Sequence, residues 1–251
     1  ILGFHYNCLY NVETGPPENG LTRGELFNFP AGELAPLTKI LMGQNMVKSI
    51  HTPLVKLEWY PDPPTWSFLC DIEEASRNRT FRMIAASIEH ATEIGAEYIV
   101  VHFPTLSTDS KGESESQLLD IARKSCDRLA ELSVKSGIPL HVEGLVNSPY
   151  LSDGFLIEVL SQYPLRYCFD AGHMSLASKM RDFDLFEFVE IISPYVGSVH
   201  LWNSRGPDDY QLFRHIPVHP SQNPEDGWAD IEKILKILKP DYPVIFESPP
   251  M

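Results

Sequence analysis

Short apolar segments that each end in an acidic or imidazole side chain constrain the fold of this chain more than any other feature. Six such segments read MVKSIHTP, EYIVVHF, IPLHVEG, RYCFDAGH, VGSVHLW and YPVIFES. Strands that all deliver polar groups at their carboxyl ends are typical of a site built on one rim of a parallel barrel. The side chains at or just past these ends are His51, His102, Glu143, Asp170, His173, His200 and Glu247.

Strand-like and helix-like segments alternate along the chain, which is the pattern of an α/β parallel sheet. The expected strands cover residues 1–7, 46–53, 98–103, 139–143, 165–170, 197–202, 213–218 and 242–247. Helices are expected at 32–44, 73–94, 114–135, 155–162, 183–192 and 230–238. No linker, repeat or composition break interrupts the sequence. We therefore predict one α/β domain over residues 1–251, a (β/α)8 TIM barrel with a metal site at the C-terminal rim of the strands.

The two-residue period of a strand predicts which side chains face the inside of the barrel. If His102 points inward, Ile99 and Val101 point towards the helices. The same rule places His141 one layer below Glu143, where it is a candidate to support a metal ligand from behind. Small or polar residues are expected below the proposed ligands, namely Ser49, Cys168 and Ser198.

Four of the strand-end residues are the strongest candidates for metal ligands: Glu143, Asp170, His200 and Glu247. A carboxylate turned inward between apolar neighbours needs a cation or hydrogen-bond donors to be tolerated there. Carboxylates and imidazoles together are ligands of many divalent ions. Structural explanations stay open at this point: an ion pair for each glutamate, a cap of the following segment for the aspartate, and a hydrogen-bonded core histidine at position 200.

The other histidines are weaker candidates when taken one at a time. His51 and His102 occupy equivalent strand ends, and their repetition suggests that they are additional metal ligands. In RHIPVHP, His215 is preferred over His219 as a further ligand.

Substrate contacts are expected from His173, Trp202 and Asn203, which follow two of the strand ends. In FDAGH, Gly172 is expected to turn the chain so that His173 reaches back towards the strand.

Composition restricts the partners. A net charge of −14, with 20 basic residues, disfavours a large electrostatic interface with nucleic acid. A small molecule is the expected substrate, and no apolar stretch approaches the roughly 20 residues of a membrane span. Four scattered cysteines without a CxxC pair favour a reduced, cytoplasmic protein without structural disulfides (Cys8, Cys70, Cys126 and Cys168).

Taken in order, the motifs resemble a known family. The series SIHTP, VVHFP, VEG, DAGHMSLA, VHLWNSRG, RHIPV, DGWADI and FES, from about residue 46 to 248, is similar to the xylose-isomerase-like barrels. That superfamily includes sugar isomerases and epimerases as well as endonuclease IV. For its sugar-handling members the resemblance implies one metal held by Glu143, Asp170, His200 and Glu247, with the two glutamates also acting as the acid/base pair.

Resemblance to endonuclease IV implies a different metal content. In that enzyme a three-zinc cluster uses further histidines, which map to His51, His102, His173 and His215. The chain departs from this pattern at Phe213, which occupies the place of an aspartate in the last ligand pair. This departure argues against a third metal site and against the phosphodiester chemistry that depends on it.

The resulting prediction is a divalent-metal-dependent isomerase or epimerase of a sugar or sugar phosphate. The metal, Zn or Mn with Mg or Co as further options, would stabilise an enediolate while Glu143 and Glu247 transfer the proton. The alternatives are a zinc phosphodiesterase acting on abasic DNA, a metal-dependent lyase of a polyol, and a barrel that binds a ligand without turnover. Assembly into a homo-oligomer is also considered. Candidates for binding a substrate phosphate are Lys56, Arg205 and Arg214.

Overall fold

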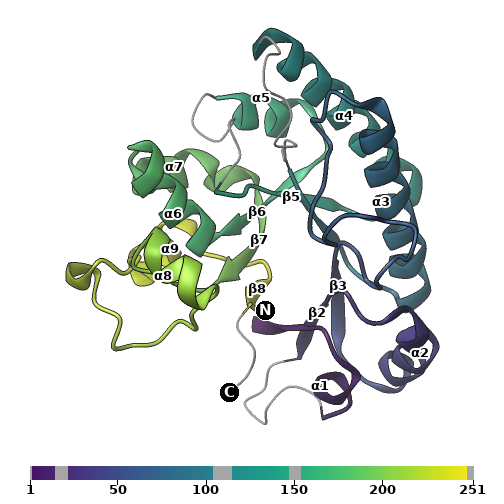
Figure 1. Cartoon of the computed structure of the whole chain (residues 1–251). Helices are drawn as coiled ribbons and strands as arrows, with labels where there is room; N and C mark the ends of the chain where they lie inside the picture. The colour runs from purple at the N-terminus through teal and green to yellow at the C-terminus, as the bar shows by residue number, and fades with distance from the viewer. Residues whose placement is uncertain (1, 15–21, 104–114, 147–153, 248–251) are drawn as a thin grey trace.

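Eight parallel strands close into a barrel, each pairing with the next and β8 pairing with β1 (Figure 1). The computed structural model describes residues 2–14, 22–103, 115–146 and 154–247. The predicted TIM barrel is confirmed. The strands are β1 (Leu2–Tyr6), β2 (Arg23–Leu26), β3 (Val47–His51), β4 (Ile99–His102), β5 (Leu140–Glu143), β6 (Arg166–Asp170), β7 (Val196–Leu201) and β8 (Val244–Phe246).

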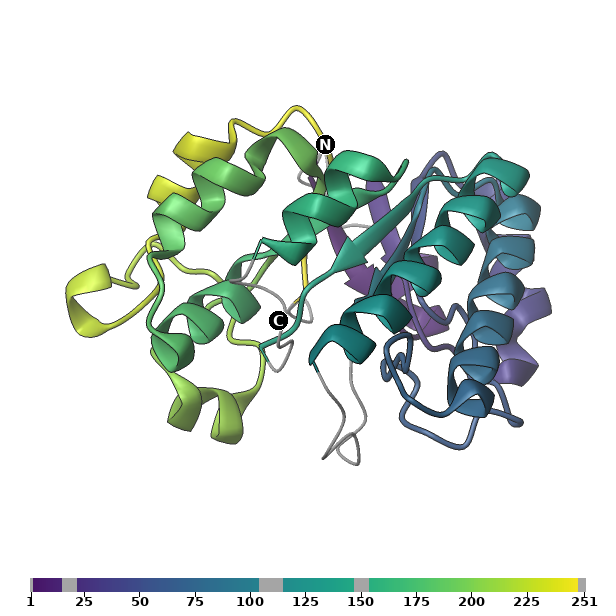
Figure 2. The ribbon, with the colours of Figure 1, turned by 90° about the horizontal axis from the view of Figure 1, so that it is seen from above.

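Helices surround this barrel, with α3 and α4 on one side and α6 to α9 on the other (Figures 1 and 2). No described helix is long and apolar enough to cross a membrane. The helices are α1 (Leu9–Thr14), α2 (Leu34–Gly43), α3 (Glu74–Ile94), α4 (Glu115–Ser136), α5 (Phe155–Gln162), α6 (Ala171–Arg181), α7 (Leu185–Ile192), α8 (Pro207–Phe213) and α9 (Ile231–Leu238).

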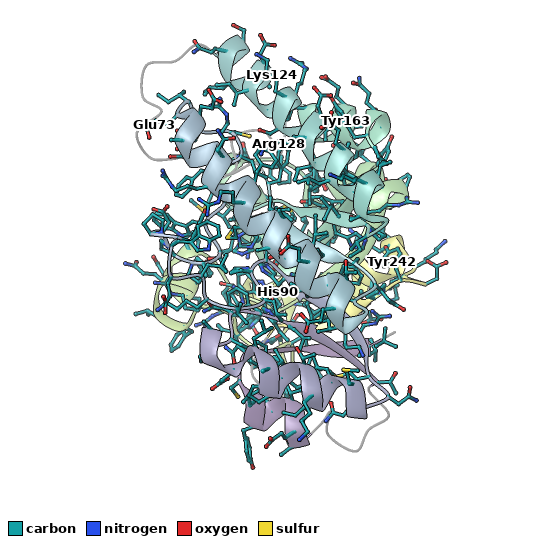
Figure 3. All side chains as sticks on the ribbon, turned by 90° about the vertical axis from the view of Figure 1, so that its right-hand side faces the viewer. Glu73, His90, Lys124, Arg128, Tyr163 and Tyr242 are labelled. Carbon is teal, nitrogen blue, oxygen red and sulfur yellow. The ribbon has the colours of Figure 1, made fainter. Side chains whose placement is uncertain are left out.

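The longest described helices show why the outer layer forms where the sequence predicted it. In α3, Phe81, Ile84, Ile88 and Ala91 recur at helical spacing and are buried against the barrel. The helix ends at Gly95, whose φ of 68° is the left-handed conformation that glycine adopts without strain. Figure 3 looks onto this layer, where Arg128 of α4 donates to Asn78 of α3 and lies over Phe81. The labelled His90, on α3, faces the same side of the molecule.

One strand lies where none was expected. Strand β2 has the sequence RGEL, which shows no alternation of apolar and polar residues, yet all four of its residues are buried. Gly24 packs so tightly that an added Cβ would stand 2.8 Å from Sδ of Met46. The charge of Arg23 can be buried in this strand because its guanidinium lies 2.7 Å from the carboxylate of Glu97.

The seventh strand predicted at residues 213–218 is wrong. Phe213 is the last residue of helix α8, and Arg214 has a φ of 58°, which no regular strand accommodates. Ile216 makes only an isolated bridge to Asn203, and Pro217 lacks the N–H that a ladder would need. The barrel still has the predicted number of eight strands, because β2, which was not predicted, is present and the strand at residues 213–218 is not.

Burial separates the two faces of the strands as the two-residue period predicted. Ile99 and Val101 belong to the large apolar core between strands and helices, whereas Val100 and Tyr98 form a separate cluster inside the barrel. Below the rim, His141 Nδ1 lies 2.9 Å from Oγ of Ser198 and its ring stacks on Tyr98 at 4.2 Å. These contacts connect His141 with the barrel interior and not with a proposed ligand.

Candidate metal centre

A cavity of about 500 Å³ opens at the carboxyl ends of the strands. His51, His102 and Glu143 line it from the ends of β3, β4 and β5, and Glu247 lines it just after β8. The strand-end series therefore converges on one site, as the barrel geometry requires.

Glu143 lies among three imidazoles. Its Oε2 is 3.2 Å from Nε2 of His51, 3.5 Å from Nε2 of His102 and 3.5 Å from Nδ1 of His200. Burial alone would raise the pKa of this carboxyl, but the imidazoles of His102, His200 and His51 hold it well below its usual range. His102 is itself fixed by a 2.6 Å contact between Nδ1 and the carbonyl oxygen of Thr65.

His200 connects the two glutamates of the site. Its Nδ1 is 3.0 Å from Oε1 of Glu247 as well as 3.5 Å from Glu143, and the ring is fully buried. On the other side of the ring, Nε2 is 2.8 Å from Oε1 of Glu25. Neither ring N–H points directly at its neighbouring oxygen, so these short contacts are ion pairs and not well-aligned hydrogen bonds. The second oxygen of Glu247 is 3.3 Å from Nδ1 of His215.

Asp170 caps the segment that follows its strand, which is the structural role that the sequence left open beside that of a metal ligand. Its Oδ1 accepts a 2.6 Å hydrogen bond from the N–H of His173 and so caps helix α6, which is absent from the helices predicted from the sequence. Its Oδ2 accepts a 2.8 Å hydrogen bond from Nε1 of Trp202. Burial, with the charges of Glu247 and Glu143, raises the pKa of this carboxyl well above its ordinary value.

Gly172 lies within α6 and does not form the turn that was expected of it. It leaves room for the indole of Trp202, because an added Cβ would stand 2.2 Å from two ring carbons. The same indole stacks on the ring of His215 at 4.2 Å, and His173 meets it edge-on at 5.1 Å. This aromatic cluster positions both histidines at the cavity wall.

Two expected substrate contacts lie behind the cavity instead of lining it. Trp202 is completely buried, and its N–H is already bonded to Asp170. Asn203, also buried, donates to the carbonyl of Ala229 and accepts from the N–H groups of Ser204 and Ala229. We propose that both have a structural role. His173, the third expected contact, does line the cavity.

Two residues of the site were missed in the sequence. His5, on β1, lines the cavity with its Nδ1 3.8 Å from Oε1 of Glu247. Glu25, on β2, is fully buried beside His200. A glutamate at the third position of RGEL carried no signal, because no apolar run precedes it. His5 did stand inside the strand expected at residues 1–7, but Tyr6 and Asn7 follow it, so it did not mark the end of that strand.

The donor set fits a divalent cation. Among the described residues, four sets of ligand atoms lie within 4.8 Å of one another: His51–His102–Glu143, His51–His200–Glu247, Glu143–Cys168–His200 and Glu143–Asp170–His173. Two ligands each about 2.1 Å from a metal stand roughly 3.0–3.4 Å apart, close to the 3.0 and 3.5 Å that separate Nδ1 of His200 from Glu247 and Glu143. That nitrogen, Oε2 of Glu247 and Nδ1 of His173 are buried without a hydrogen-bond partner. A cation would satisfy these atoms and offset the repulsion between the carboxylates.

Solved structures of similar fold are mostly sugar epimerases. A structure described as a D-tagatose 3-epimerase-like protein has a TM-score of 0.73 and 20% identity, covering 98% of this chain and 90% of that one. A zinc-bound IOLI protein has a TM-score of 0.73 and 13% identity, covering 98% and 88%. Endonuclease IV from Thermus thermophilus has a TM-score of 0.58 and 19% identity, covering 100% and 93%. At these identities the likeness demonstrates the fold alone.

Sequence comparison places the chain in a family. No curated protein matches it by sequence. The family described as the xylose isomerase-like TIM barrel matches residues 26–251, which include strands β3 to β8 and every described residue that lines the cavity except His5 and Asn7. Because this match spans most of the chain and agrees with the closed barrel, the chain belongs to the xylose isomerase-like TIM barrel family.

Proposed function

We propose that this protein is a divalent-metal-dependent isomerase or epimerase of a free sugar or polyol. The observation that carries the proposal is the approach of Glu143 and Glu247, from β5 and β8, to the same Nδ1 of His200 at 3.5 and 3.0 Å. Two carboxylates that share one imidazole beside a cavity can bind a metal and also act on a substrate held there. The epimerases among the structural neighbours support this reaction class.

The chemistry is divided between the metal and the protein. A metal held by Glu143, Asp170, His200 and Glu247 would supply Lewis-acid polarisation of a substrate carbonyl. Glu143 and Glu247 would remove and return the proton on the adjacent carbon. Neighbouring imidazoles hold the pKa of both glutamates well below its usual value, so both are ionised at neutral pH and carry the charge that binds a cation.

The cavity lining favours an unphosphorylated substrate. Among the described residues that line it there is neither Lys nor Arg, and Phe27, Trp66 and Met180 provide apolar surface. None of the three basic residues considered for phosphate binding lines this cavity, and Arg205 instead pairs with Asp209 at 2.7 Å. The only basic residue outside the described part of the chain is Lys111.

Solvent deuterium incorporation tests the proposed reaction without knowledge of the product. Free ketohexoses such as D-fructose and D-tagatose are incubated with Mn²⁺- or Co²⁺-loaded protein in D2O, and proton exchange next to the carbonyl is followed by NMR. Glu143→Gln and Glu247→Gln should each slow exchange by about 10²–10⁴-fold. Glu158→Gln, which changes only an ion pair with Arg123 on the outer surface, is the matched control. Exchange at the wild-type rate in both active-site variants would exclude this assignment of acid and base.

A zinc phosphodiesterase is the second candidate, and one observation favours it. His51, His102 and Glu143 form a second ligand set, which shares His51 with the set of His200 and Glu247. Against it, Phe213 is 61% exposed at the end of α8 and supplies no carboxylate beside His215. Elemental analysis of the purified protein separates the two functions. About one metal per chain supports the epimerase, whereas two or three zinc ions together with cleavage of an abasic duplex support the phosphodiesterase.

A further inference from the structure

Glu25 is a carboxylate buried inside the barrel, and its oxygens lie close to a histidine and a serine. It is fully inaccessible to solvent, and its two oxygens have different partners. Oε1 lies 2.8 Å from Nε2 of His200, and Oε2 accepts a 3.0 Å hydrogen bond from the hydroxyl of Ser49. Ser49 is the cross-strand neighbour of Glu25 on β3, so the sheet register itself holds the pair together. A buried charge of this kind persists only where its partners compensate the lost hydration.

The two nitrogens of His200 face different groups. Nδ1 faces Glu247 and Glu143, the two glutamates of the candidate metal centre, while Nε2 faces Glu25. Glu25 belongs to none of the described sets of metal-ligand spacing. It therefore acts on the imidazole from the side away from the cavity and not on the metal directly.

We propose that Glu25 is the positioning residue of the metal centre. Its carboxylate charge, 2.8 Å from Nε2 of His200, favours the tautomer with the proton on that nitrogen, so that the Nδ1 lone pair faces Glu143 and Glu247, and it holds the ring in that orientation. Histidines that bind metals usually donate their other N–H to such a group, and loss of that group weakens metal binding about 10–100-fold. The inference rests on the metal centre of the proposed function, but not on the identity of the sugar.

Ser49 completes the arrangement. Its hydroxyl fixes the second oxygen of Glu25, so the carboxylate cannot rotate freely away from His200. A purely structural ion pair between Glu25 and His200 would make the barrel more stable without changing metal affinity. The positioning role instead predicts that metal affinity and ligand geometry change while the fold is retained.

Metal binding by Glu25→Gln distinguishes these roles. Gln keeps the size of the side chain and removes its charge. Zn²⁺ affinity is measured by competition with a chromogenic chelator, ligand geometry by the visible spectrum of the Co²⁺ form, and folding by circular dichroism. We expect Zn²⁺ to bind about 10–100-fold more weakly, with an altered Co²⁺ spectrum. Glu97→Gln is the matched control, because Glu97 pairs with Arg23 of the same strand outside the cavity.

A folded Glu25→Gln protein with wild-type Zn²⁺ affinity and an unchanged Co²⁺ spectrum would overturn the inference. If that variant does not fold, Ser49→Ala tests the inference, because it frees the Glu25 carboxylate to rotate without removing it. Zn²⁺ should then bind several-fold more weakly, and unchanged Zn²⁺ affinity in Ser49→Ala would also overturn the inference. Absence of metal binding in the wild type would overturn both this inference and the proposed function. Weakened binding in Glu25→Gln with no deuterium exchange by the wild type would support Glu25 and reject only the reaction.

Discussion

Replacing His141 by Gln should change how the stability of the protein depends on pH. His141 is enclosed in the barrel, and burial lowers its pKa from 6.5 to about 3. The unfolded chain takes up a proton on this histidine below pH 6.5, whereas the folded protein does not until about pH 3. The folded-state pKa is depressed, so acid favours the unfolded state, and this residue costs stability as the pH falls through that window.

The magnitude follows from the size of that window. One group that binds a proton only in the unfolded state changes the free energy of unfolding by about 1.4 kcal/mol per pH unit. Between about pH 6.5 and 4.5, His141 should therefore lower the free energy of unfolding by nearly 3 kcal/mol. Gln does not titrate, so the variant does not lose this stability. At neutral pH, His141→Gln loses the contact with Ser198 and the stacking on Tyr98, a loss of about 1–3 kcal/mol. The variant should thus be less stable at neutral pH and as stable as the wild type, or more so, near pH 4.5.

Urea unfolding at a series of pH values, with a chelator present, measures this difference. The free-energy gap between variant and wild type should close by about 1.4 kcal/mol per unit as the pH falls below 6.5. Ser198→Ala is the control, because it removes the hydroxyl partner but keeps the imidazole, and its gap should stay nearly constant. A gap for His141→Gln that does not change between pH 6.5 and 4.5 would refute the reasoning.

Three further outcomes are expected. Gly172→Ala should lower the free energy of unfolding by at least about 1–3 kcal/mol, measured in urea, because its Cβ would stand 2.2 Å from the Trp202 ring; an unchanged midpoint would contradict the packing. Trp202→Phe removes the donor to Asp170 and should cost about 1.5–3 kcal/mol in the same assay, whereas full retention of stability would mean that this hydrogen bond contributes nothing. Saturating Zn²⁺ at about 100 times its dissociation constant should stabilise the protein by roughly 2.7 kcal/mol, or about 5–11 °C in Tm, and chelation should reverse the shift. A Tm that changes neither when Zn²⁺ is added nor when a chelator is added would argue against a metal centre.

Much of the cavity could be predicted because its signal is local. Each ligand candidate on β3, β4, β5 and β7 directly ends an apolar run, and the two-residue period states which side chains share its face. His102, with Val101 and Ile99 on the opposite face, shows that this reasoning applied to the real strand. Closure of the barrel then brings distant strand ends together, so a list of strand ends already described most of the site.

Other features depended on contacts between distant segments. RGEL becomes a strand because β1 and β3 pair with it on both sides, and Arg23 is tolerated because Glu97 reaches it from 74 positions away. Residues 213–218 contain apolar side chains, but no strand edge is free to pair with them since β7 already pairs with β8. Whether such a segment forms a strand depends on the strands available to pair with it, which local propensity does not contain.

The sequence by itself determined the barrel, its C-terminal rim and the set of carboxylates and imidazoles that meet there, because period, apolar runs and strand ends are properties of neighbouring residues. Only the tertiary structure decided which groups support them: Glu25 behind His200, and Trp202 behind Asp170. Those contacts join residues 175 and 32 positions apart (200 − 25 and 202 − 170). They exist because closing the sheet removes these polar groups from water and leaves each with only the partners that the barrel provides.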